Sequence, residues 1–167
     1  MDEALKAAKK ASEKWKTNTD ILFILGSILD EVGNKKEALE VMENLLSIQP
    51  DNYQALNYIG YTLAEQEKNL DRAIDLLTLA NKLSPNQAYI IDSLAWALFK
   101  SGKKQAALNE IRKAVNIDQN TDPTIWEHYG EIALSLGMNK EAKKAYQKAL
   151  DLNPSNADDI RKKLSKL

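Results

Sequence analysis

The most constraining feature of this chain is an internal repeat with a period of about 34 residues. Four short stretches carry an alanine at their third position: KEAL (36–39), DRAI (71–74), QAAL (105–108) and KEAK (140–143). Successive alanines lie 35, 34 and 35 residues apart, at Ala38, Ala73, Ala107 and Ala142. A fixed period of this length is typical of a solenoid in which helix pairs stack in one direction.

Four apolar segments lie between these stretches, and each is centred on a small residue: Gly26, Gly60, Ala95 or Gly130. In the first segment, Leu22, Leu25 and Leu29 recur at spacings of three and four, which predicts one apolar helix face. A small residue on that face lets a second helix approach closely. With only 6 Gly and 4 Pro in 167 residues and many strong helix formers, the sequence predicts an all-α fold of antiparallel helix pairs.

Helix ends are indicated by capping residues and prolines. Pro50, Pro85 and Pro154 follow the expected second helices, which proline cannot continue, whereas the third repeat has Gln119 at this position. Expected N-caps of helices are Asn34, Asn139, Asp122 before Pro123, and a capping pair of Ser155 with Asp158.

These positions match a known repeat pattern, W-x2-L-G-x2-Y followed by A-x3-F-x2-A and P. The last repeat matches best, through Trp126, Tyr129, Gly130, Ala142, Tyr146, Ala149 and Pro154. The chain therefore resembles the tetratricopeptide repeat (TPR) family, which implies a right-handed α-solenoid. The stretches LNYIGYTLAEQEKNLDRAIDLL and DSLAWALFKSGKKQAAL look like repeats of bacterial TPR proteins, some of them envelope lipoproteins. The resemblance favours a bacterial origin and leaves three placements open: the cytoplasm, the periplasm, and tethering to a membrane through a preceding segment.

We expect a single TPR domain over residues 1–167. Its expected parts are a lone second helix (2–17), four repeats (19–52, 53–87, 88–121 and 122–154) and a C-terminal capping helix (155–167). The first of these parts has no first helix of its own, which predicts that the chain is a fragment of a longer array.

The composition argues against several functional classes. The chain has no cysteine and a single histidine, His128, so no Cys or His metal site is expected. A net charge of −1 does not favour nucleic-acid binding, and no apolar run reaches the ~20 residues needed to cross a membrane. Catalytic and nucleotide-binding motifs are not found, so we expect neither an enzyme nor a cofactor. His128 is expected to be a partly exposed helix residue, with a pH-sensitive groove contact as the alternative.

By the resemblance, the first helices line a concave groove. Counting from each small residue, the inner positions are six and three before it and one, four and five after it. Seven of these positions hold acids and one, Lys100, holds a base; several others hold aromatic residues. From this set we predict the partner-binding residues Phe23, Asp30, Asn57, Tyr61, Tyr89, Asp92, Trp96, Phe99, Glu127 and Glu131.

Aromatic residues in a concave surface favour binding hot spots, and acids around them steer basic segments. The expected function is therefore a non-catalytic scaffold that binds a basic and apolar peptide or helix of a partner protein. Packing between neighbouring repeats is the alternative role for these aromatics. Two further functional alternatives are end-to-end self-association and an accessory repeat domain of a larger bacterial envelope protein.

Overall fold

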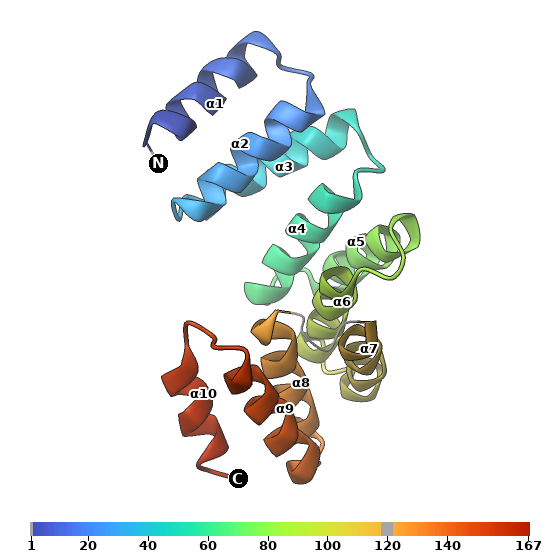
Figure 1. The fold of residues 1–167 in the computed structure, drawn as a ribbon. Coiled ribbons are helices and arrows are strands. Elements are labelled where there is room, and N and C mark those ends of the chain that lie inside the picture. The colour runs from blue at the N-terminus through green and yellow to red at the C-terminus, as the bar shows by residue number, and fades with distance from the viewer. Residues whose placement is uncertain (1, 118–121) are drawn as a thin grey trace.

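The structure, a computed structural model, describes residues 2–117 and 122–167. These residues form ten helices and no strand (Figure 1), so the all-α prediction is confirmed. The helices are α1 (Asp2–Lys14), α2 (Thr19–Glu31), α3 (Lys35–Ile48), α4 (Tyr53–Glu65), α5 (Leu70–Leu83), α6 (Ala88–Lys100), α7 (Lys104–Ile117), α8 (Pro123–Ser135), α9 (Asn139–Asp151) and α10 (Ala157–Leu164).

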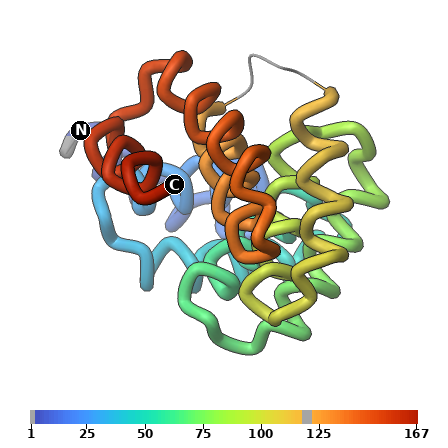
Figure 2. Tube along the Cα trace, turned by 90° about the horizontal axis from the view of Figure 1, so that it is seen from below, coloured from blue at the N-terminus to red at the C-terminus, as the bar shows by residue number. Residues whose placement is uncertain are grey.

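Consecutive helices pack as pairs, and the pairs stack into a solenoid. The pairs are α2 with α3, α4 with α5, α6 with α7 and α8 with α9, while α1 packs on α2 and α10 packs on α9. Figure 1 shows the N-terminus at one end of the stack and the C-terminus at the other. Figure 2 shows the stack winding round a common axis, so that α10 returns to the side of the molecule on which α1 lies.

The small residues of the period lie where two helices of a pair approach most closely. A Cβ atom added at Gly26 would lie 2.6 Å from Cε of Met42, and one at Gly130 would lie 2.5 Å from Cε1 of Tyr146. Met42 and Tyr146 each follow a repeat alanine by four residues, and those alanines, Ala38 and Ala142, are fully buried. The period therefore has a direct cause: glycine on one helix leaves room for a large side chain on its partner.

Two of the predicted caps are confirmed. The side chain of Asn34 accepts a hydrogen bond from the backbone N–H of Glu37, as an N-cap should. Asp122 accepts from the N–H of Thr124 at 2.8 Å, with Pro123 in the first turn of α8.

Two other predicted caps are wrong. Asn139 is the first helical residue of α9, and Met138 occupies the cap position, because the turn after Gly137 ends one residue earlier than expected. Helix α10 begins after Asn156, so Ser155 lies outside it, and Asp158 instead pairs with Arg161 at 2.7 Å. Gln119, the residue at the expected proline position, lies outside the described residues.

Candidate functional site

A pocket of about 610 Å³ opens between α2 and α4. Helix α6 contributes Tyr89 to its edge. Its lining includes eight of the inner positions expected from the repeat: Phe23, Ser27, Asp30, Gln54, Asn57, Tyr61, Glu65 and Tyr89. We call this site the α2–α4 pocket.

Helical spacing explains why these side chains meet. Phe23 and Ser27 are four residues apart on α2, and Asn57 and Tyr61 are four apart on α4, so each pair lies on one helix face. The apolar faces of both helices are used for packing within the stack, where Leu25 and Ile59 are buried. The polar and aromatic residues beside those faces are thereby left to line the pocket.

The pocket carries more negative than positive charge. Asp30 and Glu65 line it together with a single amine, that of Lys35. Asp30 accepts a hydrogen bond from the hydroxyl of Tyr58 at 3.0 Å. Burial, followed by the nearby Glu65 carboxylate, raises the pKa of Tyr61, so this phenol stays neutral and able to donate a hydrogen bond.

Asn57 lines the pocket and carries one polar atom that has no partner within the described residues. Its Oδ1 atom is buried and has no hydrogen-bond partner among them. An amide can both accept from and donate to a peptide main chain. A buried acceptor without a partner costs roughly 1–3 kcal/mol.

Asp92 and Trp96 are not exposed in a groove, and in this respect the prediction is wrong. Each is only 6% exposed. Helix α6 lies between α4 and α8, which cover its inner face. The indole of Trp96 donates to Oε1 of Glu65 at 2.5 Å and stacks on the ring of His128 with centroids 4.0 Å apart. Trp96 thus takes the alternative role, packing between repeats.

His128 is also buried, at 6% exposed, so the expected partial exposure is wrong. Its Nδ1 atom lies 2.9 Å from Oδ1 of Asp92. Burial lowers the pKa of His128, but the carboxylates of Asp92, Glu131 and Glu65 together raise it by more, so the net pKa lies above the ordinary value.

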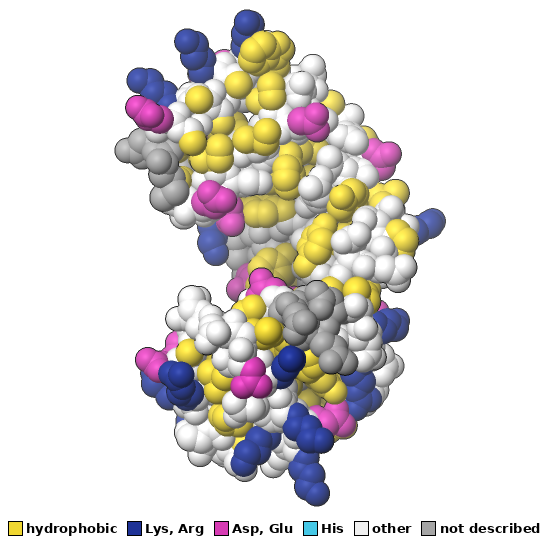
Figure 3. Space-filling view, in the orientation of Figure 1, with side chains coloured by type: hydrophobic (Ala, Val, Ile, Leu, Met, Phe, Trp, Pro, Cys, Tyr) yellow, Lys and Arg dark blue, Asp and Glu magenta, His cyan; other side chains and the backbone are white. Residues whose placement is uncertain are grey.

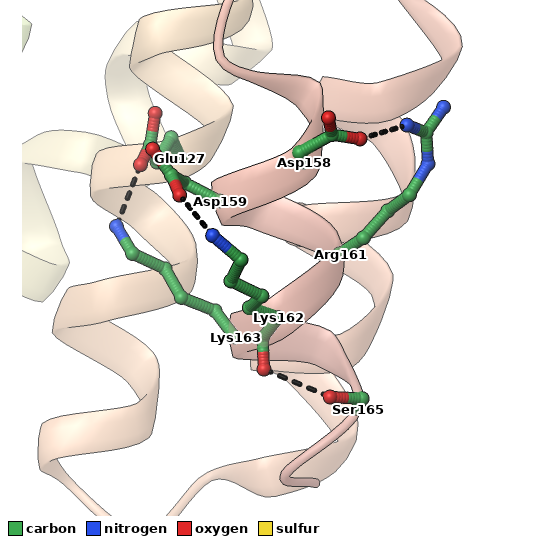
Figure 4. A network of polar contacts seen from close by, with 7 residues as sticks. All are labelled: Glu127, Asp158, Asp159, Arg161, Lys162, Lys163 and Ser165. Atoms are coloured by element: carbon green, nitrogen blue, oxygen red, sulfur yellow. Dashed lines mark hydrogen bonds and ion pairs between the residues drawn. The ribbon is translucent and has the colours of Figure 1, made fainter.

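Glu127 and Glu131 lie on α8 facing α10, where Lys163 binds both of them. Lys163 Nζ is 2.6 Å from Oε1 of Glu127 and also bonds to Glu131, and Asn156 donates to Oε2 of Glu127 at 2.8 Å. Figure 4 shows Lys163 reaching from α10 to Glu127. Burial raises the pKa of Glu127, but the bonds from Lys163 and Asn156 lower it by more.

Phe99 completes the set of predicted residues. Its ring centroid is 5.3 Å from that of Trp96, and with Glu131 and Lys163 it lines a separate pocket of about 360 Å³. The structure therefore brings Phe23, Asp30, Asn57, Tyr61 and Tyr89 together in the α2–α4 pocket and places the other five predicted residues elsewhere.

The space-filling view shows the same difference between the two halves. In Figure 3, apolar side chains gather over the upper part of the molecule, where α1 to α4 lie. Lys and Arg side chains gather over the lower part, where α8 to α10 lie, and also along the top edge, over α1. Away from that edge, the upper part shows more apolar surface than charge on this face.

Five lining residues lie outside the inner positions expected from the repeat: Lys35, Met42, Tyr58, Thr62 and Gln66. The sequence does offer a signal for Tyr58, because this aromatic residue lies one residue after the inner position Asn57. In the structure its hydroxyl donates to Asp30 of the neighbouring repeat. Lys35 and Met42 belong to the second helix α3, which a rule based on first helices cannot include.

The described residues also bear on metal binding and on membrane insertion. No group of three His, Asp or Glu side chains in residues 2–117 and 122–167 is arranged to hold a metal ion. Among the described helices, none is both long enough and apolar enough to span a membrane.

Two family models match the chain, both described as tetratricopeptide repeat. One covers residues 25–88, and the other covers 88–121 and 123–156, so that together they span more than half of the chain. The chain belongs to the tetratricopeptide repeat family. TPR repeats are typically interaction modules, and TPR proteins bind other proteins or peptides.

Similar proteins include bacterial TPR proteins. The TPR repeat-containing protein PA4667 of Pseudomonas aeruginosa is 25% identical over 130 residues, which are 78% of this chain and 22% of that protein. The TPR chain thus spans about a fifth of the length of that relative. The crystal structure of TTC0263, a thermophilic TPR protein of Thermus thermophilus, has a TM-score of 0.77 at 23% identity and covers 99% of this chain and 89% of that one.

YrrB, described as a TPR protein with an unusual peptide-binding site, has a TM-score of 0.69 at 22% identity. The match covers 93% of this chain and 79% of YrrB. At these identities, the similarity to solved structures shows the TPR solenoid alone.

Proposed function

We propose that this TPR chain is a non-catalytic scaffold segment that binds an extended segment of a partner protein in the α2–α4 pocket. The observation that carries the proposal is the lining of this pocket, in which the carboxylates of Asp30 and Glu65 lie with the rings of Phe23 and Tyr61 around one space. Acids and aromatic rings on one concave surface suit a basic and apolar segment.

The lining favours a basic and apolar partner segment. Asp30 and Glu65 provide two carboxylates for a Lys or Arg side chain, whereas the single amine is that of Lys35. Phe23, Tyr61 and the 43% exposed Tyr89 provide aromatic surface for apolar side chains or for the face of a guanidinium. The volume of about 610 Å³ is in the range of ligand-binding pockets.

A displayed library of short random peptides tests the proposal. The wild-type protein is the target, and an Asn57→Ala/Tyr61→Ala variant is the counter-target, since both residues are only partly buried and their loss should leave the fold intact. We expect enrichment of peptides that combine Lys or Arg with apolar residues and that bind the variant at least about tenfold more weakly.

An outer-face variant, Lys144→Ala, serves as the matched control, because Lys144 lies on α9 and outside this pocket. Enriched peptides should bind this variant as they bind the wild type. Peptides that bind the double variant as tightly as the wild type, or no enrichment on a folded wild-type protein, would overturn the proposal.

A further inference from the structure

A charged cluster lies buried beside the α2–α4 pocket. Asp92 and Trp96 of α6 and His128 of α8 are each 6% exposed, and Nδ1 of His128 lies 2.9 Å from Oδ1 of Asp92. Removing two charges from water is costly, and a buried ion pair is weak evidence for added stability. Such a pair is often found where a structure responds to a change of charge.

Two contacts join this cluster to the pocket. Trp96 Nε1 donates to Oε1 of Glu65 at 2.5 Å, and Glu65 lines the pocket. The ring of Tyr61, another lining residue, has its centroid 6.4 Å from that of His128. A carboxylate available to a basic partner is therefore held by an indole that is stacked, at an interplanar angle of 12°, on the single histidine of the chain.

We propose that His128 is a positioning residue for the α2–α4 pocket: acting through Asp92 and Trp96, its protonation state sets the orientation of Glu65 and so makes partner binding depend on pH. The part that concerns binding rests on the proposed function. The part that concerns the contact from His128 to Glu65 stands on the geometry alone.

The charged groups that act on His128 are Asp92 on α6, Glu65 on α4, and Glu127 and Glu131 on its own helix α8, and the ring of Tyr61 on α4 lies 6.4 Å away. The charged groups on the neighbouring helices α7, α9 and α10 include Arg112, Glu141 and Lys163. Arg112 is bonded to Glu141, and Lys163 is bonded to Glu127 and Glu131. The Asp92 carboxylate therefore faces the imidazole as its direct charge partner.

The sign of the effect follows from these partners. Burial lowers the pKa of His128, but Asp92, with Glu131 and Glu65 beyond it, raises the pKa above its ordinary value. Below that pKa an imidazolium pairs with Asp92. As the pH rises through it, the imidazole becomes neutral and Asp92 remains as a buried carboxylate without a cationic partner. The packing of Trp96 then loosens, Glu65 is no longer held, and the affinity for a basic partner falls.

NMR tests the contact without any ligand. The single imidazole and the indole N–H of Trp96 are followed from acidic to alkaline pH. We expect the indole signal to move with the same midpoint as the imidazole, and that midpoint to lie above ~6.5. Asp92→Asn should lower both midpoints together, whereas Asp75→Asn, an exposed residue of α5, should leave both unchanged. If the indole signal of Trp96 does not change as the imidazole of His128 titrates, the proposed link from His128 to Glu65 is wrong.

Binding tests the consequence, with an enriched peptide from the display selection as the probe. From below to above the imidazole midpoint, its affinity for the wild type should fall by about fivefold or more, a usual size for coupling between sites. Glu65→Gln, a change at an exposed residue, should remove this pH dependence while His128 still titrates. A wild-type affinity that is constant across the titration would overturn the proposal. If no peptide binds at any pH, the proposed function is wrong. The NMR titration of the indole then still tests the link between His128 and Trp96.

Discussion

At Gly60, a single methyl group decides how α4 packs on α5. A Cβ atom there would lie 2.6 Å from Cγ of Leu77, a branch point, and 3.1 Å from the carbonyl oxygen of Ala73. At Gly26 the nearest atom, at 2.6 Å, is the terminal Cε of Met42. A methionine end can turn aside, but a branch point and a backbone carbonyl cannot.

We expect Gly60→Ala to lower the free energy of unfolding by about 1–3 kcal/mol, which is the usual cost of overpacking. Gly26→Ala should change it by less than about 1 kcal/mol, because alanine gains up to ~1 kcal/mol of helix propensity over glycine. Chemical denaturation measures both values. The packing account fails if Gly26→Ala proves the more costly of the two.

Trp96 and Tyr61 should separate stability from binding. Trp96→Ala removes a side chain that is 6% exposed, so we expect a loss of about 3–5 kcal/mol in the free energy of unfolding. Tyr61→Ala, at a partly exposed residue of the pocket, should cost less stability and should weaken peptide binding. Thermal unfolding and titration with an enriched peptide distinguish the two variants. Equal effects of both substitutions on stability would contradict the assignment.

The same residues show what sequence can establish about the site. The repeat register placed Asn57 and Tyr61 on the inner face of α4, and both line the pocket. The same register could not show that α4 and α8 cover Asp92 and Trp96. Helix periodicity indicates which residues share a face, but it does not indicate which other helices pack on that face. His128 was missed for the same reason, since its partner Asp92 lies 36 residues away in the sequence.

At the scale of the helix, α10 is held by apolar packing, centred on Ile160 with Leu164 beside it, and by one cation. Ile160 is fully buried, and Lys163 binds the carboxylates of Glu127 and Glu131 on α8. The other charged residues of α10 pair along its own surface, as Asp159 does with Lys162 at 3.0 Å (Figure 4). Surface pairs of that kind contribute little.

Lys163→Met should lower the free energy of unfolding by about 1–2 kcal/mol at neutral pH, because Glu127 and Glu131 lose a charged donor that is only partly exposed to water. In the wild type the pKa of Glu127 is lowered, so its contribution is complete above the ordinary value of ~4.3 and is lost as the pH falls through the lowered pKa. Without Lys163 the pKa of Glu127 is lowered less, so acid unfolding should begin at a higher pH.

Circular dichroism against pH measures this shift, with Lys162→Met as the control on the same helix. The side chain of Lys162 is 73% exposed, so its replacement should leave the acid transition in place. If both variants unfold at the same pH as the wild type, Lys163 does not stabilise α10 on α8.

At the scale of the whole molecule, the repeat period predicted the solenoid. A repeated helix pair packs against the next pair along the chain, so the period indicates which helices are neighbours. The curvature that brings α4, α6 and α8 together arises from side chains in several repeats at once, and no single repeat contains it. The division of the predicted groove into an open first half and a second half occupied by Lys163 therefore required the structure.

A stack of this kind should open from its ends. Helix α6 has eight buried residues, whereas Ala8 is the buried residue of α1 and Ile160 that of α10 among the described residues. Hydrogen exchange should therefore be slowest in α6 and fastest in α1 and α10. Equal protection along the chain would show that the molecule unfolds as one unit.

The most direct test of the central claim is to locate a bound peptide by NMR chemical-shift mapping on the wild-type protein. The account predicts that a basic and apolar peptide shifts the signals of α2, α4 and the start of α6, including the side-chain amide of Asn57. Shifts confined to the outer helices α5, α7 and α9, or to α1 and α10 at the two ends, would contradict it.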